Sequence, residues 1–174
     1  MSGRLISARR VLVGVGLLLL ASGAPAQEAP PGCTAMTYAN PSRQVLRCPD
    51  MTIEAEAGTR FQTIDANRDG VPEGVDLGGG AVLIEIVPGR VRSFKVQTPH
   101  AIASVRGTLY VVDVEPAKTA VFVARGLVGV RKAAEPREVV LERGEGVDVE
   151  AGVPLEKKVW GSGRVMAVLA RFAR

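Results

Sequence analysis

Residues Gln97–Thr108 read QTPHAIASVRGT, and the run LYVVDV follows at once at Leu109–Val114. The apolar residues between Ala101 and Val105 form a short run of the kind that is buried in a sheet. Gly107 then interrupts the apolar pattern, and glycine can adopt a positive φ or let a neighbouring backbone approach closely. The pattern therefore predicts two strands joined at a glycine kink, in the centre of the folded domain.

Short apolar runs recur along the whole chain, separated by turn residues about every 8–12 positions, which is typical of all-β folds. Met51–Ala57 alternates apolar and polar residues, and Ala81–Val87 is apolar almost throughout. Gly78–Gly80 is predicted to be a flexible turn. The runs Thr119–Ala124 and Leu127–Arg131 flank a two-residue Arg-Gly turn and predict a β-hairpin. We expect an all-β fold of stacked short strands and hairpins, arranged as a sandwich, a barrel or a solenoid.

The C-terminal residues change to helical periodicity. Apolar residues recur at i, i+3, i+4 and i+7 from Val165 to Phe172, so the sequence predicts a short C-terminal helix over Arg164–Phe172. The tail around it is basic, and Trp160, the only tryptophan, precedes it. Two roles are open. The tail docks to a partner groove or an acidic membrane surface, or it packs on the β-body with Trp160 as its anchor.

The run TPHAIASVRGTLYVVDV resembles the core motif of FecR domains, the periplasmic part of FecR-type sensors. The segments at Ala120–Arg131 and Leu141–Val149 are similar to the strands and glycine turns that follow in that family. The resemblance covers about a third of the chain, Phe94–Gly152, and implies an all-β, sandwich- or solenoid-like binding module without a catalytic centre. The positions that carry the family motif are Thr98, Pro99, His100, Ala101, Val105, Arg106, Gly107 and Thr108.

In full FecR sensors an anti-sigma region and a membrane helix precede this domain, and a C-terminal part contacts an outer-membrane receptor. Here a predicted signal peptide, Met1–Ala26, stands in their place, with arginines first, then an apolar run at Val11–Ala21 and the small-x-small site Ala24-Pro25-Ala26. The apolar run is about half of the ~20 residues that a bilayer-spanning helix needs, which favours cleavage over a retained anchor. We expect a periplasmic or secreted protein, with no stable membrane insertion after signal removal.

The net charge of +4 depends largely on this signal peptide, which holds three arginines and no acidic residue. The remaining chain carries 19 basic and 18 acidic residues and few aromatic ones, so a nucleic-acid partner is not expected. We divide the chain into a signal peptide at 1–26, a disulfide-bearing segment at 27–50, an all-β domain at 51–154 and the basic tail at 155–174. Cys33 and Cys48 are predicted to form the disulfide, since a two-cysteine metal site would need further ligands.

The segment DANRDGVPEGVD matches the D-x-[DN]-x-[DN]-G pattern of a calcium loop. Alternate residues of a tight loop point inward together and supply the hard oxygen ligands that Ca²⁺ takes. An aspartate stands where the pattern usually has glutamate, and a strand-like run precedes the loop, so a helix–loop–helix hand is not expected. The alternative is a polar turn between strands. The predicted ligands of a weak, structural calcium ion are Asp65, Asn67, Asp69, Val71 and Asp76.

No catalytic set can be named in the sequence, so an enzyme is not expected. His100 is the single histidine, and we expect it to be a structural residue or a polar contact in a recognition surface. Glu54 and Glu56 share one face of a strand and are predicted to be solvated. Arg106 interrupts an apolar run and needs a partner, for which Asp113 is the candidate.

The residues and the resemblance together predict a non-enzymatic, exported FecR-like binding or sensor module. Its expected partner is an envelope protein or a small ligand, in cell-surface signalling. The alternative function is a structural, calcium-stabilised scaffold protein of the cell envelope, which would self-associate. Direct control of a sigma factor is not assumed, because the sequence shows a signal peptide where the family has its anti-sigma region.

Overall fold

The computed structural model describes residues 29–91 and 93–174, and the predicted signal peptide lies outside them. In this part of the chain strands dominate and one short helix follows them, so the all-β prediction with a C-terminal helix is confirmed. The elements are β1 (Thr34–Ala39), β2 (Ser42–Cys48), β3 (Met51–Glu56), β4 (Arg60–Ile64), β5 (Gly74–Ile86), β6 (Phe94–Gln97), β7 (Ala101–Val105), β8 (Leu109–Val114), β9 (Lys118–Arg125), β10 (Val128–Lys132), β11 (Glu138–Leu141), β12 (Glu145–Glu150), β13 (Lys158–Val159) and α1 (Ser162–Ala170).

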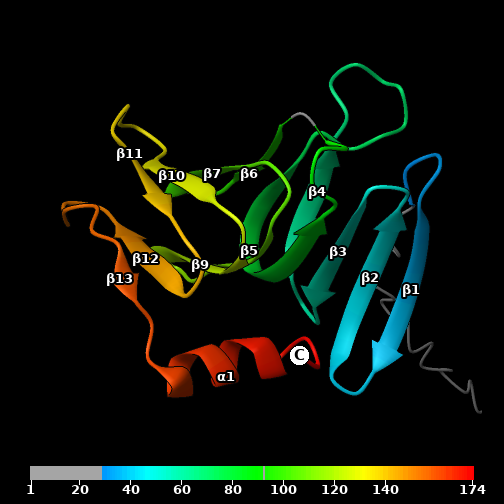
Figure 1. The fold of residues 1–174 in the computed structure, drawn as a ribbon. Coiled ribbons are helices and arrows are strands. Elements are labelled where there is room, and N and C mark those ends of the chain that lie inside the picture. Colours follow the sequence, from blue (N-terminus) through cyan, green and yellow to red (C-terminus); the bar gives the residue numbers. More distant parts are fainter. Residues whose placement is uncertain (1–28, 92) are drawn as a thin grey trace, which may run out of the picture.

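Two curved sheets form the body and share the long strand β5 (Figure 1). Sheet A has the order β1-β2-β3-β5-β8-β9-β12-β13, and sheet B has the order β4-β5-β6-β7-β10-β11. The pairs are antiparallel except for β5 with β6. The first half of β5 pairs in sheet B and its second half pairs in sheet A. β5, rather than the stretch Gln97–Thr108, is therefore the central strand of the fold.

The glycine run Gly78–Gly80 lies inside β5, so the prediction of a flexible turn there was wrong. The run marks the point where β5 leaves sheet B and enters sheet A. Gly80 has a φ of +85° and lies against Thr59, so that a side chain at this position would collide with that residue. Glycine thus bends the strand, while the residues on either side keep their ladder partners.

The chain crosses between the sheets at glycines with positive φ. β7 in sheet B leads through Gly107 to β8 in sheet A, in agreement with the predicted two strands joined at a glycine kink. β9 in sheet A leads through Gly126 to β10 in sheet B, and β11 leads through Gly144 back to β12. β9 and β10 therefore pair with different neighbours, and the predicted hairpin between them was wrong. The Arg-Gly dipeptide redirects the chain to the opposite sheet instead of folding it back on the same one.

The main hydrophobic core fills the space between the two sheets. All strands except β1 and β13 contribute inward-facing side chains to it, as the alternation of β3 predicts for that strand. The largest fully buried side chains of this core are Phe94, Tyr110, Ile53, Leu77, Ile84, Ile86 and Leu141. The two-sheet arrangement therefore buries most of the apolar runs in the described part of the chain.

The N-terminal hairpin β1–β2 continues sheet A beyond β3. Cys33, which precedes β1, is bonded to Cys48 at the end of β2, and this confirms the predicted disulfide. A disulfide that closes a loop of this length contributes about 3 kcal/mol, mainly by restricting the unfolded chain. The N-terminal segment is thus part of the sheet and is covalently fixed to it.

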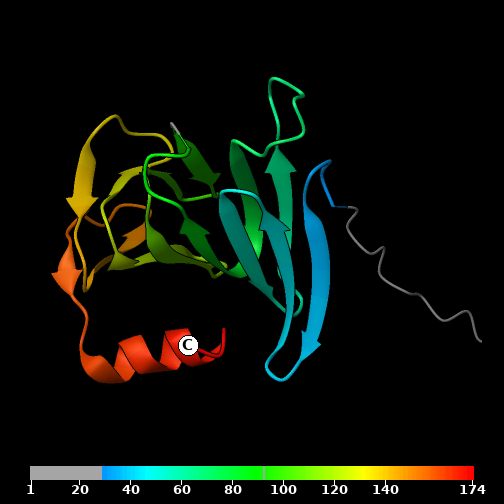
Figure 2. The same cartoon turned by 45° about the vertical axis from the view of Figure 1, so that its right-hand side comes forward.

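Helix α1 lies across the outer face of sheet A (Figures 1 and 2). Val168 and Phe172 pack there against Leu83, Val111 and Phe122 in a second apolar cluster. The central strands of sheet A are apolar on both faces for this reason, since one face meets the main core and the other meets α1. The predicted packing of the tail on the β-body is confirmed. None of the helical residues described belongs to a helix long and apolar enough to cross a membrane.

Candidate functional site

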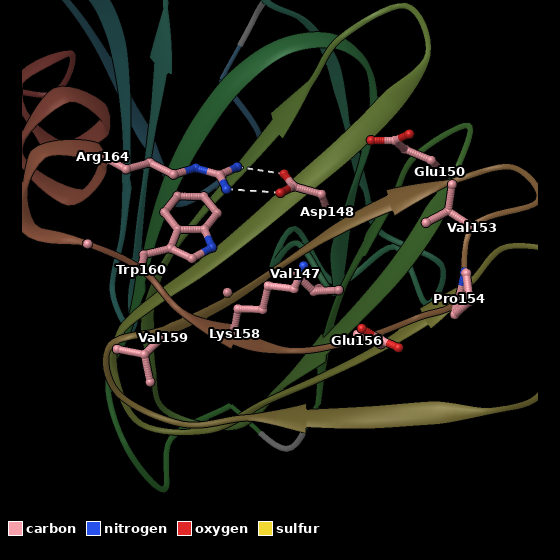
Figure 3. Close-up of a pocket in the computed structure, with 12 residues that line it drawn as sticks. Val147, Asp148, Glu150, Val153, Pro154, Glu156, Lys158, Val159, Trp160 and Arg164 are labelled. Carbon is pink, nitrogen blue, oxygen red and sulfur yellow. Dashed lines mark hydrogen bonds and ion pairs between the residues drawn. The ribbon is translucent and has the colours of Figure 1, made fainter.

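A groove opens at the end of sheet A, between β12, the segment that follows it and the first turn of α1 (Figure 3). Its volume is about 370 Å³, which lies in the range of ligand-binding pockets. We call it the Trp160 groove. Its lining residues are Gly146, Val147, Asp148, Glu150, Val153, Pro154, Glu156, Lys158, Val159, Trp160, Gly161 and Arg164.

Trp160 forms the inner wall of the groove. Its ring stacks on Phe122 of β9, with the ring centroids 5.0 Å apart and an interplanar angle of 22°. Gly146 of β12 permits this position, because a side chain there would collide with the indole ring and with the carbonyl of Val121. The tryptophan therefore anchors the tail to sheet A, as predicted for it, and gives the groove a rigid wall.

Arg164 of α1 covers Trp160 and binds Asp148 of β12 (Figure 3). The guanidinium carbon lies 3.5 Å from the ring centroid, in a cation–π contact. The two terminal nitrogens donate to the two carboxylate oxygens, which is the strong bidentate geometry. The hydrogen bond from Arg164 lowers the pKa of the Asp148 carboxyl, although partial burial opposes the shift. The lowered pKa keeps the Asp148 carboxyl ionised near neutral pH, where it accepts both hydrogen bonds from Arg164.

Other charged side chains of the groove are free of ion pairs. Among the residues that the structure describes, Glu150, Glu156 and Lys158 form no salt bridge. Val153 and Val159 leave 44% and 79% of their surface exposed beside them. The outer part of the groove thus presents unpaired charge and accessible apolar surface, both of which can contact a bound molecule.

The segment that follows β12 forms the far wall of the groove. β12 pairs with β9 from Gly146 to Glu150, but with β13 only at Glu145 and Gly146. After Glu150 the chain returns through residues 151–157 to β13, and Leu155 of this segment is buried in the main core. Within the described ranges, the groove side of β12 from Val147 to Glu150 has no strand partner.

The motif residues around His100 form a different cluster, at the turn between β6 and β7. The buried hydroxyl of Thr98 accepts hydrogen bonds from the backbone N–H groups of His100 and Ala101. It also lies 2.9 Å from the hydroxyl of Thr119 on β9, which in turn lies 3.1 Å from Nδ1 of His100. This small network fastens a corner of sheet B to sheet A and gives the single histidine a structural partner.

Residues 34–129 match the family model of the FecR protein, over more than half of the chain. The chain belongs to the FecR family. A search of curated proteins finds no match. Two crystal structures of a proposed anti-sigma factor from Parabacteroides distasonis ATCC 8503 are similar in fold, each with a TM-score of 0.61 and 21% sequence identity. The matches cover 79% and 78% of this chain, and the chain spans 64% of the length of those structures.

Other residues of the FecR motif shape the corner between the sheets. Ala101 and Val105 are buried in the main core, and Pro99 lies in the turn before β7. Gly107 has a φ of +68° and lies against Pro88, so that a side chain there would collide with the proline backbone. Thr108 is fully buried beside it. These motif positions specify the crossing from sheet B to sheet A and lie outside the lining of the Trp160 groove.

Two predicted electrostatic roles in the FecR chain were wrong. Arg106 is exposed at the end of β7, and the predicted partner Asp113 binds Arg171 after α1 instead. The predicted solvated pair is also engaged, because Glu54 is buried against two arginines and Glu56 binds Arg171. Since both acids lie on the outer face of sheet A, the tail covers the side that the alternation of β3 alone assigned to solvent.

The predicted calcium ligands lie in and beside the loop between β4 and β5. Asp65 accepts hydrogen bonds from the backbone N–H groups of Asp69 and Gly70. Asp69 accepts one from the N–H of Val71, and its other carboxylate oxygen accepts one from the amide of Asn67. The side chains therefore order the loop through its own backbone. The predicted ligand Asp76 lies further on, within β5 and opposite Gln62.

No group of three or more His, Cys, Asp or Glu side chains in the described ranges is arranged to hold a metal ion. The predicted loop also depends on amide and backbone oxygens, those of Asn67 and Val71. Calcium binding by the FecR chain therefore stays a prediction.

Sequence reasoning identified Trp160 as an anchor but did not find the groove. Asp148 and Arg164 are sixteen positions apart, in a strand and a helix whose relative placement depends on the loop between them. Gly146, within an otherwise alternating strand, was the one local signal, because a glycine inside a strand marks the close approach of another group.

Proposed function

We propose that this FecR-family chain is an exported, non-enzymatic binding module that contacts an envelope protein or ligand in cell-surface signalling. The observation that carries the proposal is the Trp160 groove, where a rigid wall adjoins unpaired charges and exposed apolar surface. Asp148 and Arg164 are engaged with each other in a bidentate ion pair, and this arrangement favours recognition over acid–base chemistry.

Two further observations support an envelope location and a signalling role. The disulfide between Cys33 and Cys48 is the kind of bond that persists outside the reducing cytoplasm. The predicted signal peptide provides a route of export. The fold is shared with structures of a proposed anti-sigma factor, and signalling is the expectation that the FecR family brings to this chain.

Affinity capture tests the proposal. The oxidised protein is immobilised through a tag before Cys33, far in sequence from the groove, and exposed to solubilised cell envelope. We expect the same envelope protein or glycan to be recovered in replicate captures, and to be lost with Arg164→Glu, which sets two like charges against each other at Asp148. Repeated captures that recover no envelope component would contradict the proposal.

A further inference from the structure

Strand β1 forms one outer edge of sheet A (Figure 1). Its six residues, Thr34–Ala39, all pair with β2, and in the described part of the chain no strand and no backbone hydrogen bond occupies its second edge. The chain before β1 leads away from this edge, since Ala29 packs against the main core and Pro31 lies against Gly70. After β1 the chain turns directly into β2 at Asn40-Pro41. The second edge of β1 is therefore open along its length.

The composition of β1 sets it apart from the other outer strands. Its sequence, TAMTYA, contains no charged residue and no proline. In contrast, β4 begins at Arg60 with a shift of register, β11 begins at Glu138 and β13 contains Lys158. Charges, prolines and bulges on an outer strand hinder the pairing of a further strand. Of the outer strands that the structure describes, β1 is thus the one without such protection.

The neighbouring strands show which backbone groups of β1 point to the open edge. The carbonyl of Ser42 accepts a hydrogen bond from the N–H of Ala57, so Ser42 turns its backbone groups toward β3. These groups alternate along a strand, so Arg43 turns its own toward β1, where Tyr38 lies opposite. The residues whose N–H and C=O groups point to the open edge are therefore Ala35, Thr37 and Ala39.

The strand is also held in an extended form. The disulfide between Cys33 and Cys48 fixes its first end to the end of β2. Near its other end, the guanidinium carbon of Arg43 lies 4.5 Å from the centroid of the Tyr38 ring. Met36, which is 42% exposed, lies on the same face as Tyr38. A strand that is ordered in advance loses little freedom when it pairs, and the exposed methionine adds apolar contact.

A second copy of this chain fits this edge better than a foreign strand does. When a strand pairs antiparallel with its own copy around a two-fold axis, a charged residue near the axis would lie close to the same charge. Pairing of a strand with itself therefore needs an uncharged strand, which pairing with a foreign strand does not. The register that pairs all the outward groups places Thr37 opposite Thr37 of the other copy, and Met36 opposite Tyr38.

We propose that two copies of this chain pair antiparallel through β1 and join their sheets A into one continuous sheet. The inference goes beyond the proposed function. The Trp160 groove lies at the β12–β13 end of sheet A, opposite to β1, so the dimer presents two free grooves. Two linked sites raise the avidity for a partner that repeats its own site. The dimer is weak and reversible, because so short an edge buries less than the roughly 1,200 Å² of a standard interface.

Sedimentation equilibrium of the exported, oxidised protein tests the pairing. We expect a monomer in dilute solution and a growing fraction of dimer toward about 1 mM. Thr37 has an exposed side chain, and Thr37→Lys should raise the Kd of the dimer at least about tenfold, because two like charges then meet at the axis. Val140→Lys is the matched control. It adds the same charge at an exposed position of β11 and should leave the Kd unchanged.

Hydrogen exchange followed by NMR tests the edge in the wild-type protein. As the concentration rises, the amides of Ala35, Thr37 and Ala39 should gain protection. Those of Met36 and Tyr38 face β2 and should change little. This measurement decides the question even where Thr37→Lys fails to fold, which its melting curve would reveal.

A wild-type protein that stays monomeric at every concentration up to about 1 mM would overturn the inference. An equal Kd for Thr37→Lys and the wild type would overturn it as well. So would protection that appears only at β4, β11 or β13, because the copies would then associate through another edge.

Discussion

The outer faces of the two sheets differ in what covers them. Sheet A presents Leu83, Val111 and Phe122 outward, and α1 lies over them. Sheet B presents exposed or half-buried residues such as Lys95 and Ser104, and no described element covers them. The central strands of sheet A are therefore apolar on both faces, whereas those of sheet B alternate. Apolar residues on both faces of a strand thus indicate a second layer, even where that layer is a single short helix.

The outer face of sheet A, which α1 covers, has an apolar centre and a rim of ion pairs. We call these ion pairs the ionic rim. Arg171 binds Glu56 and Asp113, and Arg174 binds Glu54. The carboxylates of Glu56 and Asp113, which accept hydrogen bonds from Arg171, raise the pKa of its guanidinium further above its ordinary value. Helix α1 has no side-chain N-cap and no acidic residue in its first turn, and a helix of nine residues is marginal by itself. Contacts with sheet A, more than intrinsic helicity, therefore hold it in place.

The largest effect should come from the apolar centre of the covered face. Phe172 is 1% exposed in the cluster beneath α1. Phe172→Ala should lower the free energy of unfolding by about 3–5 kcal/mol, the usual cost of removing a buried aromatic side chain. The matched control is Val140→Ala on sheet B, which is 48% exposed and should change stability by no more than about 0.5 kcal/mol. Urea denaturation measures both, and similar effects of the two variants would show that the faces do not differ as described.

The ionic rim should contribute less. Glu54 is 5% exposed and accepts hydrogen bonds from Arg43 and Arg174. Glu54→Gln keeps the shape but removes the charge, and it should cost about 2 kcal/mol because two guanidinium groups lose their partner. Glu138→Gln, on β11 of sheet B, is the control and should hardly change the free energy of unfolding. Because Glu54 is buried, added salt should change this difference only slightly. Equal effects of the two variants on the free energy of unfolding would argue against a contribution from the ion pairs.

The sequence predicted the elements better than their partners. Alternation in β3, the disulfide and the helical stripe of the tail are local patterns, and the structure contains each of them. The hairpin at Gly126 and the turn at Gly78–Gly80 were wrong, because glycine marks a change of backbone direction without specifying which sheet receives the next strand. The Trp160 groove depends on the pairing of Asp148 with Arg164, which brings a strand and a helix together. No periodicity within either element encodes that contact.

A smaller effect on stability is expected from pH, at the ion pair between Asp148 and Arg164 beside the Trp160 groove. Because Arg164 lowers the pKa of Asp148 in the folded protein, the stability from this pair is complete above the unfolded pKa of about 4 and is lost as the pH falls through the lower folded value. Asp148→Asn should therefore cost up to about 1 kcal/mol near neutral pH, as partly exposed pairs do. The difference from wild type should shrink below about pH 4. Arg164→Gln should show the same pH dependence and should cost somewhat more, because it also removes the contact with Trp160. The double variant should add little to Arg164→Gln.

The smallest effect on stability is expected at the loop between β4 and β5, which leads into the half of β5 that pairs in sheet B. If Asp65, Asn67, Asp69, Val71 and Asp76 bind calcium, Asp65 and Asp69 use the lone pairs that their backbone hydrogen bonds leave free. We expect a weak site, with a Kd of about 10⁻⁴–10⁻³ M, as in extracellular modules. When the calcium concentration equals the Kd, binding adds only about 0.4 kcal/mol to the free energy of unfolding. Calorimetry with millimolar CaCl₂ should give a small rise in Tm that Asp69→Asn reduces and that an equal concentration of MgCl₂ does not reproduce. An unchanged Tm and no heat of binding would show that the loop is a polar turn, ordered by its own backbone alone.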